Sequence, residues 1–282
     1  MIYTFTLNPS MDYIMNVENP IMGEINRSSN EILKVGGKGI NVSLVLKALG
    51  VESVICTLTA GIVGESIKSE IERLGIDKRI VEAEGCSRIN VKIAGERETA
   101  FNGSGCYASY GIINKLCNMA ESSSEDYVVL SGSVCRGLDT NIYPYIMNRL
   151  KGKFVVDTTG EMLINALKYK PFLIKPNKEE IGEIFGCPID TFEKAEIYGK
   201  KLCDMGAENV IVSMGEMGAV FVNNRETYTA ETEKVNALNT VGAGDAMVGG
   251  FLYGFINKGN FKEALLEGVR SSCRWIEGDY RI

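Results

Sequence analysis

Along most of the 282-residue chain, strand-like segments alternate regularly with helix-like ones. Short apolar runs, such as residues 2–7, 53–59 and 127–131, are each followed, directly or after an interruption, by a longer segment whose apolar residues recur at helical spacing. Neighbouring parallel strands need such crossovers, so the alternation predicts a mostly parallel sheet covered by helices on both faces. No run reaches the roughly 18 apolar residues of a membrane span, so we expect no membrane partner.

The alternation divides the chain as follows. Further strands are expected at 153–157, 172–175, 209–213 and, as a pair, 218–229, and helices after residue 41 and at 64–74, 107–120, 141–150, 161–168, 191–205, 246–255 and 261–276.

Two stretches interrupt this rhythm. Short β-leaning segments occur at 13–18, 24–28 and 30–34, and more occur within 79–101. We interpret the chain as one domain, residues 1–282, with a small β-sheet lid from about 12–34 and 86–101. The open edges of such a sheet could pair between subunits, which makes a homodimer through the lid the candidate assembly.

Composition excludes several kinds of chemistry. The chain has no histidine, which removes histidine general bases, Ser-His pairs and His-metal sites. Its net charge of −6 argues against nucleic acid as a partner. No CxxC pair occurs, so the scattered cysteines indicate free thiols in a reducing, cytoplasmic setting. They are Cys56, Cys86, Cys106, Cys117, Cys135, Cys187, Cys203 and Cys273.

The stretch Asn239–Ala246, Asn-Thr-Val-Gly-Ala-Gly-Asp-Ala, precedes a run that is apolar on nearly every side and predicts a buried helix. Gly242 and Gly244 leave first-turn N–H groups unscreened, and these donors at the positive helix end favour an anion. Asp245 adds a carboxylate, which we expect to be ionised. The arrangement suits phosphoryl transfer to a hydroxyl, whose proton Asp245 would take. The structural alternative is a glycine turn with an aspartate cap.

A second glycine turn, Gly36-Gly37-Lys38-Gly39-Ile40-Asn41, also opens a helix. Its spacing differs from a Walker A loop, but a polar substrate could approach the backbone and Lys38 could reach a phosphate. The alternative is a helix entry with a surface lysine.

The segment Lys175–Glu180, Lys-Pro-Asn-Lys-Glu-Glu, places Asn177 and Glu180 about one helical turn apart. That spacing suits a carboxylate acting on magnesium beside nucleotide phosphates. Alternatively, Asn177 is a helix cap followed by first-turn acids.

Charged residues near the lid complete the candidates. Asp12 follows the first strand and is either a ligand for hydroxyls or a turn former. Arg27 and Arg88 lie in the lid segments, where a guanidinium fits phosphate with two hydrogen bonds, although such arginines are commonly solvated.

Taken in order, Asp12, GGKGIN, SRINVKI, LSGS, DTTGE, KPNKEE, VSMGEMGA and NTVGAGDAMV span nearly the whole chain. This pattern resembles the ribokinase (PfkB) family of carbohydrate kinases, and most closely the branch with 1-phosphofructokinase and tagatose-6-phosphate kinase. The resemblance implies a ribokinase-like three-layer αβα domain, ATP and Mg²⁺ as cofactors, and a monovalent cation such as K⁺ as a further candidate.

The resemblance also implies roles for individual residues. Asp245 would be the catalytic base, with the amides of Gly242, Ala243, Gly244 and Asp245 as the anion hole. Residues implied for the sugar phosphate are Asp12, Gly37, Asn41 and Asn102 on the sugar, and Lys38, Arg88 and, more weakly, Arg27 on its phosphate. Residues implied for the nucleotide are Lys175, Asn177, Ser213, Gly215, Gly218 and Thr240, with Glu180 serving magnesium.

The expected reaction is ATP-dependent phosphorylation of a ketohexose phosphate, fructose 1-phosphate first and tagatose 6-phosphate second. The sequence departs from the family at its end, where Arg270, Arg274 and Trp275 replace small residues and the chain stops at Ile282. A second hypothesis is therefore a sugar-phosphate or nucleotide sensor that binds without catalysis. A nicotinamide dehydrogenase is a third, but the chain lacks a GxGxxG turn after its first strand.

Overall fold

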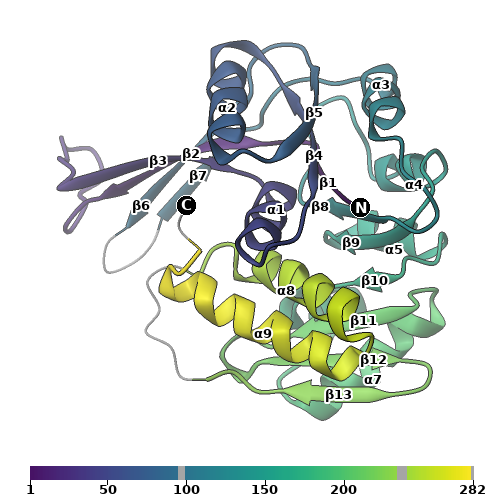
Figure 1. Cartoon of the computed structure of the whole chain (residues 1–282). Coiled ribbons are helices and arrows are strands. Elements are labelled where there is room, and N and C mark those ends of the chain that lie inside the picture. Colours follow the sequence, from purple (N-terminus) through teal and green to yellow (C-terminus); the bar gives the residue numbers. More distant parts are fainter. Residues whose placement is uncertain (95–98, 234–239, 281–282) are drawn as a thin grey trace.

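The computed structural model describes residues 1–94, 99–233 and 240–280, folded into two sheets and their surrounding helices (Figure 1). Within this described part, the large sheet has nine strands. In spatial order they are β13 (Thr227–Ala230), β12 (Ala219–Asn223), β11 (Asn209–Ser213), β10 (Leu173–Ile174), β9 (Lys153–Asp157), β8 (Tyr127–Ser131), β1 (Ile2–Thr6), β4 (Val54–Thr59) and β5 (Asp77–Glu82). The strands from β11 to β5 are parallel, and the β12–β13 hairpin extends the sheet antiparallel at one edge.

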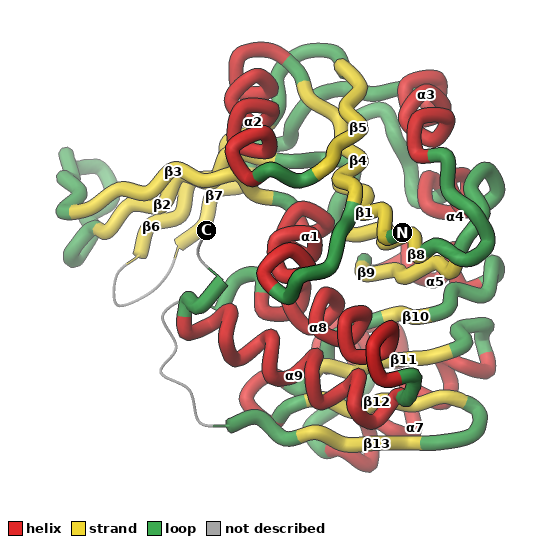
Figure 2. The backbone as a smooth tube through the Cα atoms, in the orientation of Figure 1, coloured by secondary structure: helices red, strands yellow, loops and turns green. Residues whose placement is uncertain are grey.

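Helices cover both faces of this sheet (Figure 2). One face carries α1 (Lys38–Ala48), α2 (Gly61–Leu74), α8 (Ala243–Lys258) and α9 (Phe261–Glu277). The other carries α3 (Tyr110–Ala120), α4 (Ile142–Met147), α5 (Gly160–Leu167), α6 (Lys178–Phe185) and α7 (Phe192–Asp204). Side chains of each central strand alternate between the two cores, as Phe5 and Ile2 do in β1. The expected three-layer α/β class is confirmed.

The order of the strands locates the site. β1 lies between β8 and β4, so the chain order reverses between β1 and β8. In open α/β sheets, ligands bind outside the carboxyl ends of the strands at such a reversal. Residues directly after β1, β8, β9 and β10 therefore lie at the same edge of the sheet. The first turn of α8 also lies at this edge, as the side-chain contacts described below show.

Helix α8 is buried on nearly all sides because α9 packs closely along it. A β-carbon at Gly250 would lie 2.3 Å from Ser271 Oγ, and one at Gly254 would lie 2.8 Å from Ala264 Cα, both on α9. The two glycines therefore permit the close approach of the two helices. This explains why the helix expected at 246–255 is apolar all round.

A second sheet, with four strands among the described residues, stands beside the large one (Figure 1). Its order is β3 (Asn30–Gly36), β2 (Ser10–Asn16), β6 (Arg88–Ala94) and β7 (Thr99–Asn102). The register pairs Asp12 with Lys34 on one side and with Asn90 on the other, so these three side chains share a face.

The structure corrects two expectations about the small sheet. Residues 24–28 form no strand, because the Asn26 side chain bonds locally to the backbone N–H and C=O of Ile21 and closes a turn. Residues 79–82 belong to β5 of the large sheet, where β5 pairs with β4 along its full length. Residues 95–98 of the expected lid segment and Asn239 of the glycine motif lie outside the described residues.

Several boundaries also differ from expectation. The helix expected at 107–120 begins at Tyr110, the one expected at 141–150 spans Ile142–Met147, and the strand expected at 172–175 pairs over two residues. All eight cysteines are free, and six are buried, whereas Cys86 is exposed and Cys187 half-buried. No helix in the described part of the chain is long and apolar enough to cross a membrane.

Candidate active site

Asp245 lies in the first turn of α8, where Gly242 is the N-terminal cap. The Asp245 side chain is 4% exposed, and its Oδ2 accepts a hydrogen bond of 2.8 Å from Asn41 Nδ2. Asn41 belongs to the first turn of α1, whose cap is Gly37. The two glycine turns found in the sequence therefore place their helix starts against each other, 204 residues apart along the chain.

A second carboxylate, Asp157 at the end of β9, holds two lysines beside Asp245. Lys175 Nζ lies 3.3 Å from Asp157 Oδ1, and Lys38 Nζ lies 3.5 Å from Asp157 Oδ2. A β-carbon at Gly244 would lie 2.9 Å from Lys175 Nζ, so the ammonium rests directly against the glycine turn. The site thus holds two carboxylates and two ammonium groups at the carboxyl edge of the large sheet.

These charges move the carboxyl pKa values apart. Burial and the neighbouring Asp157 charge raise the pKa of Asp245 to about 7, despite the opposing effect of Lys38 and Asn41. The expectation of an ionised, weakly basic Asp245 did not include burial and the Asp157 charge, which both raise its pKa. Burial also raises the pKa of Asp157, but the ammonium groups of Lys175 and Lys38 outweigh burial and hold that pKa below its ordinary value.

The glycine turn has the backbone that an anion hole needs. Gly242 has φ +93°, a left-handed conformation that favours glycine, and α8 begins directly after it. The Ala243 N–H donates to the Thr240 carbonyl at 3.2 Å. The remaining first-turn donors, those of Gly244 and Asp245, lie before the first intrahelical hydrogen bond of α8, which Ala246 N–H makes to Gly242 O.

The small sheet presents a second fixed carboxylate. Asp12 Oδ1 accepts hydrogen bonds from Ser10 Oγ at 2.6 Å and from Asn90 Nδ2 at 2.9 Å, and Asp12 Oδ2 pairs with Lys92 Nζ at 2.8 Å. Burial raises the pKa of Asp12, but Lys92, Ser10 and Asn90 together lower it below its ordinary value. Asp12 is thus an ionised, oriented acceptor, and it is not the turn former that the alternative envisaged.

The three remaining substrate candidates lie in different surroundings. Arg88 is partly buried, and its Nε donates to the carbonyl of Asn8 at 3.0 Å. Burial lowers the pKa of the Arg88 guanidinium. Asn102 is exposed on the edge strand β7, opposite Asn90, and Arg27 is exposed on the connection between β2 and β3. The structure therefore does not bring Arg27 to the other candidates.

The nucleotide candidates other than Thr240 lie at the carboxyl ends of β10 and β11, whereas Thr240 directly precedes the glycine turn before α8. Asn177 and Ser213 are joined by an isolated parallel bridge, and Gly218 N–H donates to Gly215 O across the one-turn 3₁₀ helix η1 (Gly215–Met217). Asn177 and Glu180 form a capping box, in which Glu180 Oε2 accepts from Asn177 N–H at 2.8 Å. The capping alternative is thus present in the structure, and it holds the Glu180 carboxylate in a fixed place.

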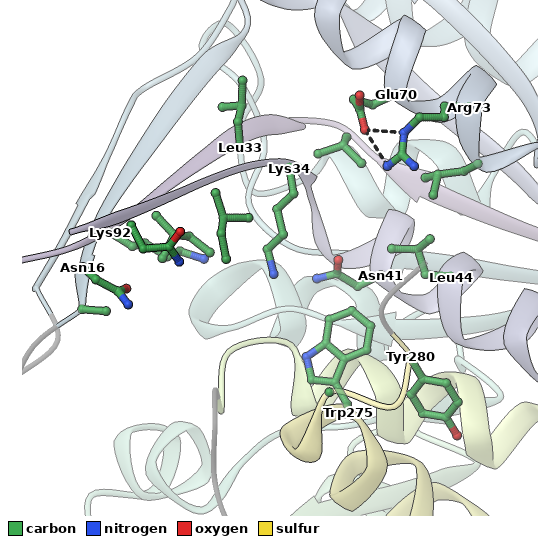
Figure 3. Close-up of a pocket in the computed structure, with 17 residues that line it drawn as sticks. Asn16, Leu33, Lys34, Asn41, Leu44, Glu70, Arg73, Lys92, Trp275 and Tyr280 are labelled. Atoms are coloured by element: carbon green, nitrogen blue, oxygen red, sulfur yellow. Dashed lines mark hydrogen bonds and ion pairs between the residues drawn. The ribbon is translucent and has the colours of Figure 1, made fainter. Parts of the chain in front are cut away.

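A cavity of about 590 Å³ opens between the small sheet, α1, α2 and the end of α9 (Figure 3). Asn41 lines this cavity, together with Lys34 and Lys92 from the small sheet and Trp275 from α9. Because Asn41 bonds Asp245, the cavity borders the catalytic candidate. Two lysines, Lys34 and Lys92, lie on its small-sheet side, and Lys92 is paired with Asp12.

Sequence reasoning missed three members of this arrangement. Asp157 begins the quoted DTTGE motif and stands at the end of a buried strand. Asp12 was selected as a candidate because it follows a strand, and the same criterion would have selected Asp157. Asn90 and Lys92 alternate with Arg88 in SRINVKI, so period-two spacing on a strand already places all three on one face. The sequence did not show that the strand carrying Asn90 and Lys92 pairs with the strand carrying Asp12, because strand pairing depends on the order of strands in the sheet.

Comparison with known proteins identifies the family. A model of the pfkB family of carbohydrate kinases matches residues 6–277. The chain belongs to this family. It is 42% identical over 275 residues to 1-phosphofructokinase of Bacillus subtilis, covering 96% of this chain and 91% of the relative. It is 34% identical to D-tagatose-1-phosphate kinase of Bacillus licheniformis, covering 89% and 84% of the two chains.

The structural comparison agrees with this assignment. The crystal structure of phosphofructokinase-2 from Escherichia coli in complex with substrates and products superposes with a TM-score of 0.92 at 25% identity. The match covers 100% of this chain and 94% of that one. Both the ribokinase-like fold and the family expected from the order of the motifs are therefore confirmed, and the chain is an ATP-dependent carbohydrate kinase rather than a dehydrogenase.

Proposed function

We propose that this protein phosphorylates fructose 1-phosphate with ATP, giving fructose 1,6-bisphosphate and ADP. The observation that carries the proposal is the placement of Asp245, which is buried at a helix start and bonded to Asn41, a residue that lines a cavity together with Lys34 and Lys92. The 1-phosphofructokinase of Bacillus subtilis, at 42% identity, supports this choice of sugar phosphate. Tagatose 6-phosphate is the alternative from sequence, and the tagatose-1-phosphate kinase relative adds D-tagatose 1-phosphate.

The chemical step follows from the geometry around Asp245. The free primary hydroxyl of the sugar faces the Asp245 carboxylate, and its oxygen forms a bond to the γ-phosphorus as the bond to the leaving ADP oxygen breaks. Asp245 takes the hydroxyl proton. First-turn amides of α8 and the Lys175 ammonium beside Gly244 stabilise the charge on the transferring group. A pKa near 7 makes Asp245 a stronger base than an ordinary aspartate.

The sugar is held between the small sheet and α1. Asp12 Oδ2 pairs with Lys92, and a carboxylate oxygen has further acceptor capacity, so Asp12 can also receive a sugar hydroxyl. Gly37 and Asn41 supply backbone and amide contacts on the opposite side. Arg88 and Lys38 are the proposed partners of the existing phosphate, and Asn102 lies on β7, an edge strand of the small sheet.

The nucleotide lies over the carboxyl ends of β10 and β11. Asn177, Ser213, Gly215, Gly218 and Thr240 border it, and Lys175 meets its phosphates. Among the described residues no cluster of three metal-ligating acids or thiols occurs. Magnesium on a kinase substrate needs only one or two carboxylates beside phosphates and water. Glu180 fits this demand, since capping engages Oε2 and leaves Oε1 for a magnesium-bound water.

The small sheet acts in this proposal as a lid, from residues 12–34 and 86–101, that closes over the sugar and excludes water. Its edge strands β3 and β7 are the surfaces for a homodimer. The sugar phosphate and ATP are the proposed partners, with no membrane or nucleic acid among them, and the cytoplasm is the proposed location.

An ADP-release assay with Mg²⁺ tests the proposal, with and without K⁺. It compares fructose 1-phosphate, tagatose 6-phosphate, tagatose 1-phosphate, fructose 6-phosphate and no sugar. The highest kcat/KM is expected with fructose 1-phosphate. Turnover with another sugar phosphate alone would move the assignment to that substrate, and thermal stabilisation by ligands without ADP release would establish the binding-only sensor instead.

A further inference from the structure

Trp275 contacts the glycine turn of the proposed active site. It lies in the last turn of α9 and is half-buried. Its Nε1–H donates a 2.8 Å hydrogen bond to the Val241 carbonyl. A β-carbon at Gly242 would lie 2.7 Å from Trp275 Nε1 and 2.8 Å from two ring carbons, so the indole packs directly against Gly242.

This contact fixes the direction of one amide. Val241 C=O and Gly242 N–H belong to the same peptide unit, which is planar and trans, so the two groups point in opposite directions. With the carbonyl held toward the indole, the Gly242 N–H points away from α9. Helix α9 also ties the turn at a second point, because Ser272 Oγ donates to the Ala243 carbonyl at 2.7 Å.

A glycine at φ +93° has many other conformations open to it, so its orientation needs an external restraint. Helix α9 can supply this restraint, because it packs closely along α8, where the absence of a side chain at Gly250 leaves room for Ser271 of α9. The same indole lines the cavity together with Asn41 (Figure 3). Trp275 therefore links the anion hole to the wall of the substrate cavity.

We propose that Trp275 is a positioning residue of the anion hole, which holds the Val241–Gly242 peptide so that its N–H faces the transferring phosphoryl group. This inference rests on the proposed function for its catalytic consequence. It also implies a signal independent of turnover, because Trp275 is the chain's one tryptophan and its emission reports on the site directly.

The test compares Trp275→Phe with Arg270→Ala. Phe keeps a ring against Gly242 but lacks the N–H, and kcat should fall about tenfold, the value of one net hydrogen bond. KM for the sugar phosphate should change less than kcat, because Phe keeps a ring at the cavity wall and none of the proposed sugar ligands is altered. Arg270 lies on the exposed side of α9 paired with Glu267 at 3.1 Å, and its variant should keep the wild-type kcat.

Emission of the wild-type protein is measured in parallel during titration with the magnesium complex of AMP-PNP, a non-hydrolysable ATP analogue. A saturable change is expected. Wild-type kcat in a folded Phe variant would overturn the inference while leaving the kinase assignment intact. Absence of turnover in the wild type with every sugar phosphate would instead overturn the proposed function. In that case the titration still tests whether Trp275 lies at the nucleotide site, and unchanged emission would overturn the inference. If the Phe variant does not fold, the same titration decides.

Discussion

Replacing Asp245 with asparagine separates its charge from its shape. An asparagine keeps an oxygen acceptor for the Asn41 amide, which now bonds Asp245 at 2.8 Å, but it cannot take a proton. Activity should fall at least 10²–10³-fold, the cost typical of a strong polar catalytic contact. In the wild type, kcat/KM should decline below pH of about 7, because the free enzyme must hold Asp245 ionised to use it as a base.

The same substitution should stabilise the unliganded protein at alkaline pH. The pKa of Asp245 is 3.8 when unperturbed and about 7 in the folded state, so unfolding releases a proton between these values. The wild type therefore loses stability as pH rises from about 4 to about 7, and the loss is constant above that. At about 1.4 kcal/mol per pKa unit, Asp245→Asn should gain about 4 kcal/mol at pH 8 and less than about 2 kcal/mol at pH 5.

Thermal unfolding of both proteins at pH 5 and pH 8 measures this difference. A gain of about 4 kcal/mol corresponds to a Tm increase of roughly 10 °C in a protein of this size. Asp204→Asn is the matched control, because Asp204 is exposed at the end of α7 and its variant should show no such pH dependence. An equal Tm difference at both pH values would refute the raised pKa, and near wild-type turnover would refute the assignment of Asp245 as the base.

Three further substitutions test the surroundings of the site. Asp157→Asn removes the negative charge that raises the Asp245 pKa, so the acidic limb of kcat/KM should move to lower pH; a limb that stays in place would contradict this coupling. Lys92→Met leaves the buried Asp12 without its cation, and unfolding measurements should show a loss of about 3–5 kcal/mol with KM for the sugar raised more than kcat is lowered. An unchanged KM would argue against Asp12 as a sugar ligand. Gly250→Ala would place a β-carbon 2.3 Å from an α9 hydroxyl oxygen, and overpacking should cost about 1–3 kcal/mol in urea unfolding, whereas a neutral effect would mean that the two helices separate easily.

Much of the fold follows from local sequence alone. Branched apolar runs and helical spacing are local properties, so the parallel sheet and its helices were predictable, as was the small sheet that interrupts them. Register and partner choice are not local. The composition of β5 suggested a short strand of the small sheet, yet six residues of β5 pair with β4 in the large sheet. Asn26 illustrates the opposite case, since one side chain closes a turn where β-propensity predicted a strand.

The candidate site was predictable where the sequence itself brings groups together. Gly242, Gly244 and Asp245 share one helical turn, so their proximity needed no tertiary information. The Asp157 ion pairs connect residues 18 and 119 positions away, and they exist only because β9, β10 and α1 share an edge of the sheet. The raised pKa of Asp245 could not be predicted from local sequence for the same reason, because burial and the Asp157 charge come from the tertiary fold.

Asp157 has a consistent electrostatic role in this arrangement. Two ammonium groups beside a glycine turn would repel each other without a phosphate between them, and Asp157 at 3.3 and 3.5 Å keeps them in place beforehand. The same carboxylate raises the pKa of Asp245 and offsets the lowering effect of the two lysines, which makes Asp245 a stronger base. An isolated Asp245 facing two unpaired lysines would instead have a low pKa and little tendency to accept a hydroxyl proton.

The third carboxylate of the region, Asp12, is paired with Lys92 and held ionised, so it is suited to accept hydrogen bonds from hydroxyls and not to remove a proton. In the proposed reaction, their surroundings therefore suit Asp12 to binding and Asp245 to base catalysis.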